Sequence, residues 1–378
     1  MFRRRPNKHR FSNNDVNRDA AAVWIDDKAR LAGFANGDAF AQHFALKRYR
    51  LTQLYRAATR ELLSDVGEVS VLSKELRAKL ALSGFQFDSV SPIAVQHSKD
   101  AQTTKALFAL RDSAEVEAVL MEHFGNRNTV CISSQAGCAY GCAFCATGQG
   151  GFTRQLSTTE IFDQARFFAR TLANEGKRIT NVVFMGMGEP FANYDAVMGA
   201  VSLLNDAHGF GLGQRHITIS TVGVVPKIER FADEAVQVNL AISLHASNDE
   251  LRSQMMPVNR RWNLDALLRA CERYVEKTNR KVFFEYVMLD GVNDSATHAH
   301  ELATLMHGRL YHVNLIPYNA TPEGEFKATP DSKIWEFAAI LEAAGIPVTV
   351  RANMGRDIAA ACGQLRAETQ PKAHSVSA

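Results

Sequence analysis

The chain has 378 residues, of which 46% are hydrophobic and 22% charged, values ordinary for a folded protein. The longest apolar run, residues 20–25, is far shorter than the ~18 apolar residues that a membrane span needs. The net charge of +3 is too small to establish a nucleic-acid partner by itself. The basic start of the chain is not followed by an apolar stretch, so it does not resemble a secretory signal. We therefore expect a cytoplasmic protein with no membrane contact.

The N-terminal quarter of the chain is predicted to be helical and basic. Residues 1–25 are expected to form a basic, flexible segment, because the first ten residues carry five Lys or Arg and no acid. Residues 26–104 follow as a helical accessory domain that binds RNA. Within it, the stretch 46–60, "LKRYRLTQLYRAATR", interleaves basic residues with tyrosines. This combination suits an RNA-binding face, although a solvated helix face explains it at least as well.

From about residue 129 onward, apolar runs rich in β-formers alternate with helical patterns. Strands separated by helices build a parallel sheet, and six or seven such units suit a barrel better than a short open sheet. We predict an α/β fold with a partial (β/α)6 barrel as the core over residues 105–366. Its active site is expected at the C-terminal ends of the strands. Residues 367–378 are expected to form a loose tail. The predicted strands are residues 129–134, 181–187, 216–221, 236–244, 281–289, 311–316 and 347–351.

Four of the six cysteines lie in one stretch, "CISSQAGCAYGCAFC", at residues 131–145. Disulfides are disfavoured in a reducing compartment. Structural zinc needs four ligands, usually as two separate C-x2-C pairs, and no second pair exists here. Cys138, Cys142 and Cys145, spaced C-x3-C-x2-C, suit a [4Fe–4S] cluster in which one iron stays open for a substrate. A zinc site with Cys131 as fourth ligand is the alternative.

The C-x3-C-x2-C spacing after the first strand of a predicted barrel resembles the radical S-adenosylmethionine (SAM) enzymes. In that family three cysteines hold the cluster, SAM chelates the fourth iron, and one electron cleaves SAM to a 5′-deoxyadenosyl radical. A narrower resemblance, to the RlmN/Cfr family of radical SAM RNA adenine methyltransferases, covers residues 105–366. It rests on motifs in matching order: "VVFMGMGEPFANYDAV", "ITISTVGVVPKI", "LAISLHASNDELRSQMMPVN", "FEYVMLDGVND", "HVNLIPYN" and "RDIAAACGQL".

The resemblance implies roles for two cysteines and one glutamate outside the cluster set. Cys362 matches the cysteine that carries the methyl group, which is needed because the adenine ring carbon is not nucleophilic. Cys131 matches the resolving thiol that attacks the Cys362 sulfur and leaves a transient disulfide. Glu117 matches the acid/base glutamate, with Glu115 as the alternative. Cys271 matches nothing and is expected in the core.

The resemblance also implies two SAM molecules per turnover and a set of SAM contacts. These contacts fall at or just beyond the ends of predicted strands, where glycine permits close approach and an acidic group can accept from an ammonium. Taken singly, each would be read as a cap or turn residue. The implied SAM contacts are Gly188, Glu189, Ser220, Ser243, Leu244, His245 and Asn319.

The implied activity is methylation of adenine C2 in the peptidyl-transferase region of 23S rRNA and 3′ to the anticodon in some tRNAs. Cfr-type C8 methylation, which implies antibiotic resistance, is the nearest alternative. Two further alternatives are a non-catalytic RNA-binding protein with a structural zinc site and a radical SAM enzyme with another substrate. An electron donor such as flavodoxin and a monomeric state are expected. Arg260, Arg261 and Trp262 are candidates for an RNA-facing surface.

Overall fold

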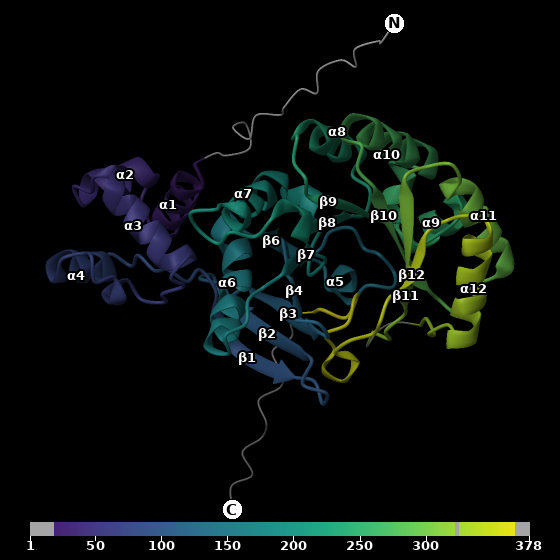
Figure 1. The fold of residues 1–378 in the computed structure, drawn as a ribbon, viewed down its shortest axis with the longest axis horizontal. Coiled ribbons are helices and arrows are strands. Elements are labelled where there is room, and N and C mark those ends of the chain that lie inside the picture. The colour runs from purple at the N-terminus through teal and green to yellow at the C-terminus, as the bar shows by residue number, and fades with distance from the viewer. Residues whose placement is uncertain (1–18, 322–324, 367–378) are drawn as a thin grey trace, which may run out of the picture.

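The computed structural model describes residues 19–321 and 325–366, which form a helical unit beside a larger α/β domain (Figure 1). A short 3-10 turn, Val66–Glu68, lies within the helical unit. No helix of the described residues is long and apolar enough to cross a membrane. The helices of the unit are α1 (Ala20–Leu31), α2 (Gly37–His43), α3 (Arg48–Thr59) and α4 (Lys74–Leu82).

The helical unit begins earlier and ends earlier than predicted. Helix α1 starts inside the segment predicted as flexible, because Asp19 caps its first turn by accepting from the Ala22 amide and Trp24 is fully buried. Residues 91–104 were predicted within the helical domain, but they hold strand β1 (Ser91–His97) and the start of β2 (Thr103–Ala109). Most of the segment 1–25 and the whole tail 367–378 lie outside the described residues.

One ten-stranded sheet forms the α/β domain, in the order β1-β2-β3-β4-β7-β8-β9-β10-β11-β12. β1 to β4, including β3 (Glu115–His123), pair antiparallel, and from β4 onward every neighbouring pair is parallel. In the described residues β1 and β12 stay the two edges, so the predicted partial barrel is confirmed. The parallel strands are β4 (Arg127–Cys131), β7 (Asn181–Phe184), β8 (Ile217–Thr221), β9 (Asn239–Ser243), β10 (Val282–Met288), β11 (Tyr311–Pro317) and β12 (Val348–Val350).

Helices cover the outer face of the parallel strands (Figure 1). Side chains along β10 point alternately to the two faces of the sheet. Val282, Phe284 and Tyr286 point outward and are fully buried under the helices. Glu285 and Val287 point inward and line a pocket. The inner face of the sheet can therefore carry polar groups without weakening the core beneath the helices. The covering helices are α6 (Thr158–Asn174), α7 (Tyr194–Asn205), α8 (Val225–Asp233), α10 (Leu264–Thr278), α11 (Ala296–Met306) and α12 (Asp331–Ala343).

A buried ion pair joins the helical unit to the α/β domain. Lys28 of α1 places its Nζ 2.6 Å from the Asp163 carboxylate of α6, 2.6 Å from the Ser89 hydroxyl and 2.6 Å from the Phe87 carbonyl. Both charged side chains are almost completely buried. All three ammonium protons therefore have acceptors, which is the condition under which a buried lysine can stay charged.

Removing one partner of this pair should destabilise the protein strongly. We expect Lys28→Met to lower the free energy of unfolding by about 3–5 kcal/mol, because it removes the cation at 2.6 Å and leaves the buried Asp163 carboxylate with only the Arg166 guanidinium, at 3.6 Å. Urea unfolding followed by the fluorescence of the nearby Trp24 measures the change. The exposed pair Arg30–Asp26 is the control, and Arg30→Met should cost about 1 kcal/mol or less. Equal effects of the two substitutions would contradict this account.

Candidate active site

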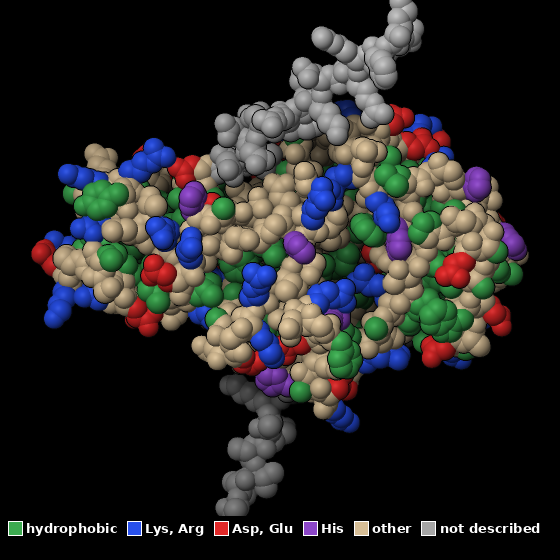
Figure 2. Space-filling view, in the orientation of Figure 1, with side chains coloured by type: hydrophobic (Ala, Val, Ile, Leu, Met, Phe, Trp, Pro, Cys, Tyr) green, Lys and Arg blue, Asp and Glu red, His purple; other side chains and the backbone are tan. Residues whose placement is uncertain are grey.

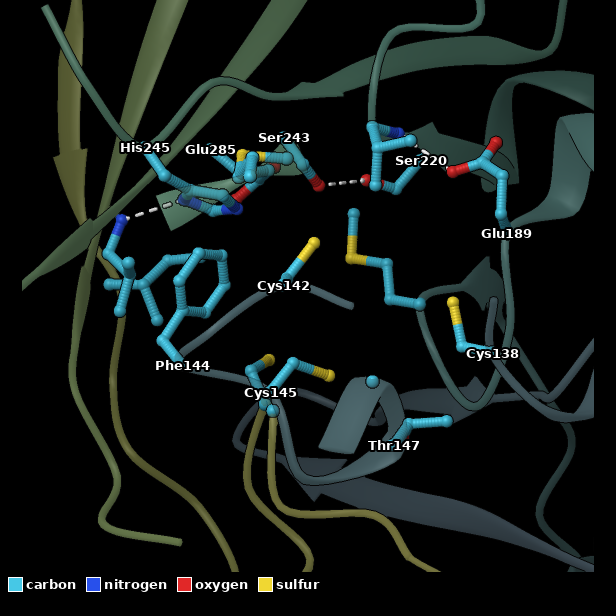
Figure 3. A pocket seen from close by; sticks show the side chains of 18 of the residues that line it. Cys138, Cys142, Phe144, Cys145, Thr147, Glu189, Ser220, Ser243, His245 and Glu285 are labelled. Atoms are coloured by element: carbon cyan, nitrogen blue, oxygen red, sulfur yellow. Dashed lines mark hydrogen bonds between the residues drawn. The ribbon is translucent and has the colours of Figure 1, made fainter. Parts of the chain in front are cut away.

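A pocket of about 1020 Å³ opens at the carboxyl ends of the parallel strands. Four cysteines line it: Cys138, Cys142 and Cys145 from the loop after β5 (Gln135–Gly137), and Cys362 from the segment after β12. Figure 3 shows the three loop cysteines in the lower half of the pocket, with Glu189, Ser220, Ser243, His245 and Glu285 across from them. The structure thus brings together residues that lie more than two hundred positions apart.

The cysteine loop is held by backbone contacts that demand particular residues. Gly137 has φ of +75°, and a Cβ there would lie 2.1 Å from the Gly151 carbonyl oxygen, so only glycine fits. The Cys138 amide donates to that same carbonyl at 2.7 Å. At the far end of the loop, the Ala146 amide donates to the Gly363 carbonyl at 2.8 Å. This last bond ties the loop to the segment that carries Cys362.

The three loop cysteines fit a [4Fe–4S] cluster better than a single zinc ion. Among the described residues, no three Cys, His, Asp or Glu side chains converge closely enough to hold one metal ion. Zinc needs all its ligand atoms at about 2.0–2.3 Å from one centre, whereas a cluster binds each thiolate through a different iron and so accepts wider spacing. Burial raises the pKa of Cys138 to about 11 and that of Cys142 well above its usual value, so cluster binding must displace protons.

Cys131 and Cys362 lie on either side of the pocket wall. Cys131 ends β4 and is buried, whereas Cys362 keeps exposed surface that opens into the pocket. Burial raises the pKa of Cys131 to about 12, and the charge of a Cys362 thiolate adds to the rise. Burial also raises the pKa of Cys362, and the positive charge of Arg351 opposes the rise for both thiols. Both cysteines are free thiols.

Glu189 is held rigidly at the end of β7. Its Oε1 accepts from the Phe191 amide at 2.9 Å and its Oε2 from the Val222 amide at 2.8 Å, so it links the loops after β7 and β8. Burial raises its pKa to about 7. The preceding Gly188 has φ of +97°, and a Cβ there would clash with the Gln135 side chain at 2.5 Å. Both residues line the pocket, and their role as SAM contacts stays a prediction.

The polar residues from β8, β9 and the loop after β9 form the opposite wall. The Ser220 and Ser243 hydroxyls lie 3.4 Å apart. His245 adopts a left-handed conformation with φ of +62°, and its Nδ1 accepts from the Val287 amide at 3.0 Å. Burial, together with the charge of Arg252, lowers the pKa of His245 to about 3, so the imidazole is neutral and carries its proton on Nε2.

Two predicted SAM contacts do not line the pocket. Leu244 is fully buried, and only its backbone makes hydrogen bonds: its amide donates to the Glu285 carbonyl at 3.0 Å, and its carbonyl accepts from the Arg252 guanidinium at 3.1 Å. Asn319 is buried behind the wall, where its Nδ2 lies 3.4 Å from the Pro317 carbonyl and its Oδ1 has no hydrogen-bond partner. That free acceptor is compatible with the predicted role of Asn319.

Glu117 also lies outside the pocket lining, on β3. Its Oε1 is 2.9 Å from the Lys105 ammonium, and its Oε2 accepts from the Arg366 amide at 2.9 Å. It is 4% exposed, whereas Glu115 is half-buried at the start of the strand. The structure therefore ties Glu117, and not Glu115, to the segment that carries Cys362. Its acid/base role stays a prediction.

Sequence reasoning missed two charged residues of the pocket, Glu285 and Arg351. Glu285 stands in the middle of the apolar strand "VFFEYVM", and Arg351 directly follows the last strand. The charge of Glu285 inside an otherwise apolar strand could have predicted a functional role, because burying a charged side chain without a partner costs free energy.

Comparison with known proteins agrees with this geometry. Residues 132–303 match the Radical SAM superfamily. A probable dual-specificity RNA methyltransferase RlmN from Thermoanaerobacter sp. is 45% identical over 84% of this chain and 92% of its own length. The ribosomal RNA large subunit methyltransferase N of Nitrosopumilus maritimus is 45% identical over 85% and 93%. A radical SAM methyltransferase from Sphaerobacter thermophilus superposes with a TM-score of 0.85 at 46% identity, covering 92% of this chain and 99% of that one.

The chain belongs to the RlmN family of radical SAM RNA methyltransferases. Membership in the RlmN family implies SAM and a [4Fe–4S] cluster as cofactors and RNA as substrate.

Cluster binding should depend on the loop cysteines and not on the core cysteine. We expect Cys142→Ala to lower the iron content of anaerobically purified protein from about four atoms per chain to below one. Cys271 is fully buried in α10, so Cys271→Ala should keep the iron. Iron and sulfide assays measure both. Stoichiometric zinc in a colourless protein would contradict the cluster and favour the zinc alternative.

Proposed function

We propose that this protein methylates C2 of an adenosine in the peptidyl-transferase region of 23S rRNA and of the adenosine 3′ to the anticodon in some tRNAs. The observation that carries the proposal is the position of Cys362, whose thiol opens into the same pocket as the three loop cysteines. The charge of a Cys362 thiolate also acts on Cys131, at the end of β4. The names of the relatives, dual-specificity and ribosomal RNA large subunit methyltransferase, support two kinds of RNA substrate. Cfr-type methylation at C8 is the alternative within the same chemistry.

Two thiols take part in the carbon transfer: Cys362 carries the carbon, and Cys131 releases the product. When bound, the cluster supplies the electron that cleaves SAM to the 5′-deoxyadenosyl radical. The Cys362 thiolate takes a methyl group from one SAM by displacement, and a hydrogen of that S-methyl group is lost to the radical from a second SAM. The carbon radical on Cys362 would then add to the adenine ring carbon, and the adduct would lose the ring proton to Glu117 and one electron to the cofactor that supplied it. The Cys131 thiolate would attack the Cys362 sulfur, forming the Cys131–Cys362 disulfide as the sulfur–carbon bond breaks. The freed carbon would take up the proton that Glu117 can return, which gives the methylated RNA.

The pocket entrance is suited to RNA. Figure 2 shows Lys and Arg side chains around a hollow in the middle of this face of the molecule. Arg260 and Arg261 are exposed, and the Arg261 guanidinium lies 4.5 Å from the centre of the Trp262 ring. A target adenosine must leave its stack to enter the pocket, which costs a few kcal/mol, so looped or flexible adenosines are the favoured targets. A cytoplasmic location, a monomeric state and an electron donor such as flavodoxin belong to the same proposal.

The methyl-carrying role of Cys362 is tested by peptide mass spectrometry. Protein expressed with its cluster and supplied with SAM should carry one methyl group on the peptide containing Cys362, because that thiol faces the pocket. The Cys271 peptide of the same sample should be unmodified. An intact cluster with unmodified Cys362 would contradict methyl transfer through Cys362, and only the family assignment would remain.

The position of the methyl group separates C2 from C8 chemistry. Ribosomal RNA from a strain lacking the gene should lose 2-methyladenosine, and returning the gene should restore it. Chromatography of nucleosides with authentic 2-methyladenosine and 8-methyladenosine measures this. Loss of the C8 isomer instead would establish the Cfr-type alternative.

SAM affinity should fall in mild acid because of Glu189. Its pKa of about 7 is raised by burial, so its carboxylate is charged above pH 7 and becomes neutral as the pH falls. We expect the Kd of SAM to rise roughly 5- to 10-fold from about pH 7.5 to pH 6, a range in which the SAM ammonium stays mostly charged. Calorimetry measures the binding, and Glu189→Gln should remove the pH dependence. An unchanged profile in that variant would exclude Glu189 as its source.

A further inference from the structure

One carboxylate oxygen in the pocket has no partner. Glu285 of β10 is 3% exposed, and its Oε1 accepts from the Asn314 side chain at 2.8 Å. Its Oε2 is buried and has no hydrogen-bond partner among the residues that the structure describes. The Leu244 and His245 amides both donate to the Glu285 carbonyl, at 3.0 and 3.2 Å, and fix its place on the pocket wall (Figure 3). A buried acceptor of this kind is costly unless a ligand supplies a donor.

An arginine faces the same pocket and is also unpaired. Arg351 follows β12, is half-buried and lines the pocket together with Glu285 and Cys362. Its backbone amide donates to the Leu315 carbonyl at 2.8 Å, which anchors the residue. Within residues 19–321 and 325–366, no hydrogen bond or ion pair of the structure uses the Arg351 guanidinium. Glu285 of β10 pairs with Asn314 of β11, and Asn314 pairs with Thr349 of β12, two residues before Arg351. The register therefore places Glu285 and Arg351 on the same face of neighbouring strands, and the charge of Arg351 opposes the rise that burial causes in the pKa of Glu285.

A carboxylate beside a guanidinium presents an acceptor next to a donor. Adenine offers the complement on two edges: its N6 amino group donates, and the adjacent N1 or N7 accepts. Guanine and hypoxanthine present an acceptor, O6, where adenine has the amino group, and O6 would face the carboxylate with no proton between them. The pair therefore suits adenine and disfavours the 6-oxo bases.

We propose that Glu285 Oε2 and the Arg351 guanidinium together bind the edge of an adenine base in the pocket and determine the enzyme's specificity for it. The inference rests on the proposed function and deepens it. Two adenines enter this pocket in that function: the target nucleotide of the RNA and the adenine of SAM. The geometry favours the RNA base, because Arg351 and Cys362 both lie on the segment after β12 and line the same pocket, and the RNA base must come to the Cys362 thiol.

The test is a change of discrimination between adenine and hypoxanthine. In Glu285→Gln, the new amide group can donate to O6, so this variant should accept inosine better relative to adenosine. We expect the ratio of kcat/KM for an RNA with adenosine at the target position to that with inosine to fall roughly 10- to 100-fold. Glu276→Gln, on the exposed face of α10, is the matched control and should keep the wild-type ratio.

A second arm identifies which adenine is bound. Methylation of Cys362 without RNA is measured with SAM and with S-inosylmethionine. A change in the RNA ratio alone assigns the pair to the RNA base, and a change in the SAM ratio alone assigns it to the SAM base; both support an adenine site. Unchanged ratios in both arms, with iron content preserved, would overturn the proposal.

One measurement needs no variant and covers the case in which Glu285→Gln fails to fold. Purine lacks the amino group, so wild-type enzyme should lose roughly 10- to 100-fold in kcat/KM with purine riboside in the RNA, or with the matching SAM analogue. Full turnover of both analogues would refute the site. Turnover of ordinary adenosine RNA by wild-type enzyme tests the proposed function separately, so the two failures are distinguishable.

Discussion

The chemistry of this protein depends on the contact between the cysteine loop and the C-terminal segment. The Ala146 amide donates to the Gly363 carbonyl, and the Thr147 hydroxyl donates to the Leu365 carbonyl. The Arg366 amide then reaches the Glu117 carboxylate on β3. These bonds place the segment that carries Cys362 beside the cysteine loop, although the two are distant in the chain. A shift of this segment by even one ångström would separate the reacting groups.

Burial in and beside the pocket favours the neutral forms of its ionisable groups. It raises the pKa of Glu189 and lowers that of His245, both in the pocket lining, and it raises the pKa of Cys131 at the end of β4. Glu189 and His245 are also fixed by hydrogen bonds from backbone amides, so their orientation is set before a ligand binds.

Two polar contacts join the helical unit to the barrel. The buried Lys28–Asp163 pair links α1 to α6. Tyr55 of α3 adds a hydrogen bond to the Asp206 carboxylate at 2.7 Å, just beyond α7. RNA binding by the helical unit stays a prediction.

The sequence by itself determined the repeating strands and helices of the parallel sheet and the cluster motif, because period and spacing are local properties of the chain. It misjudged the hairpin of β1 and β2, since amphipathic runs with turns between them are also compatible with short helices. The tertiary structure alone decided which polar residues share the pocket. Leu244 and Asn319 fall outside its lining, and Glu285 and Arg351 fall inside. Strand register and burial set these positions, and both arise from contacts between segments far apart in the chain.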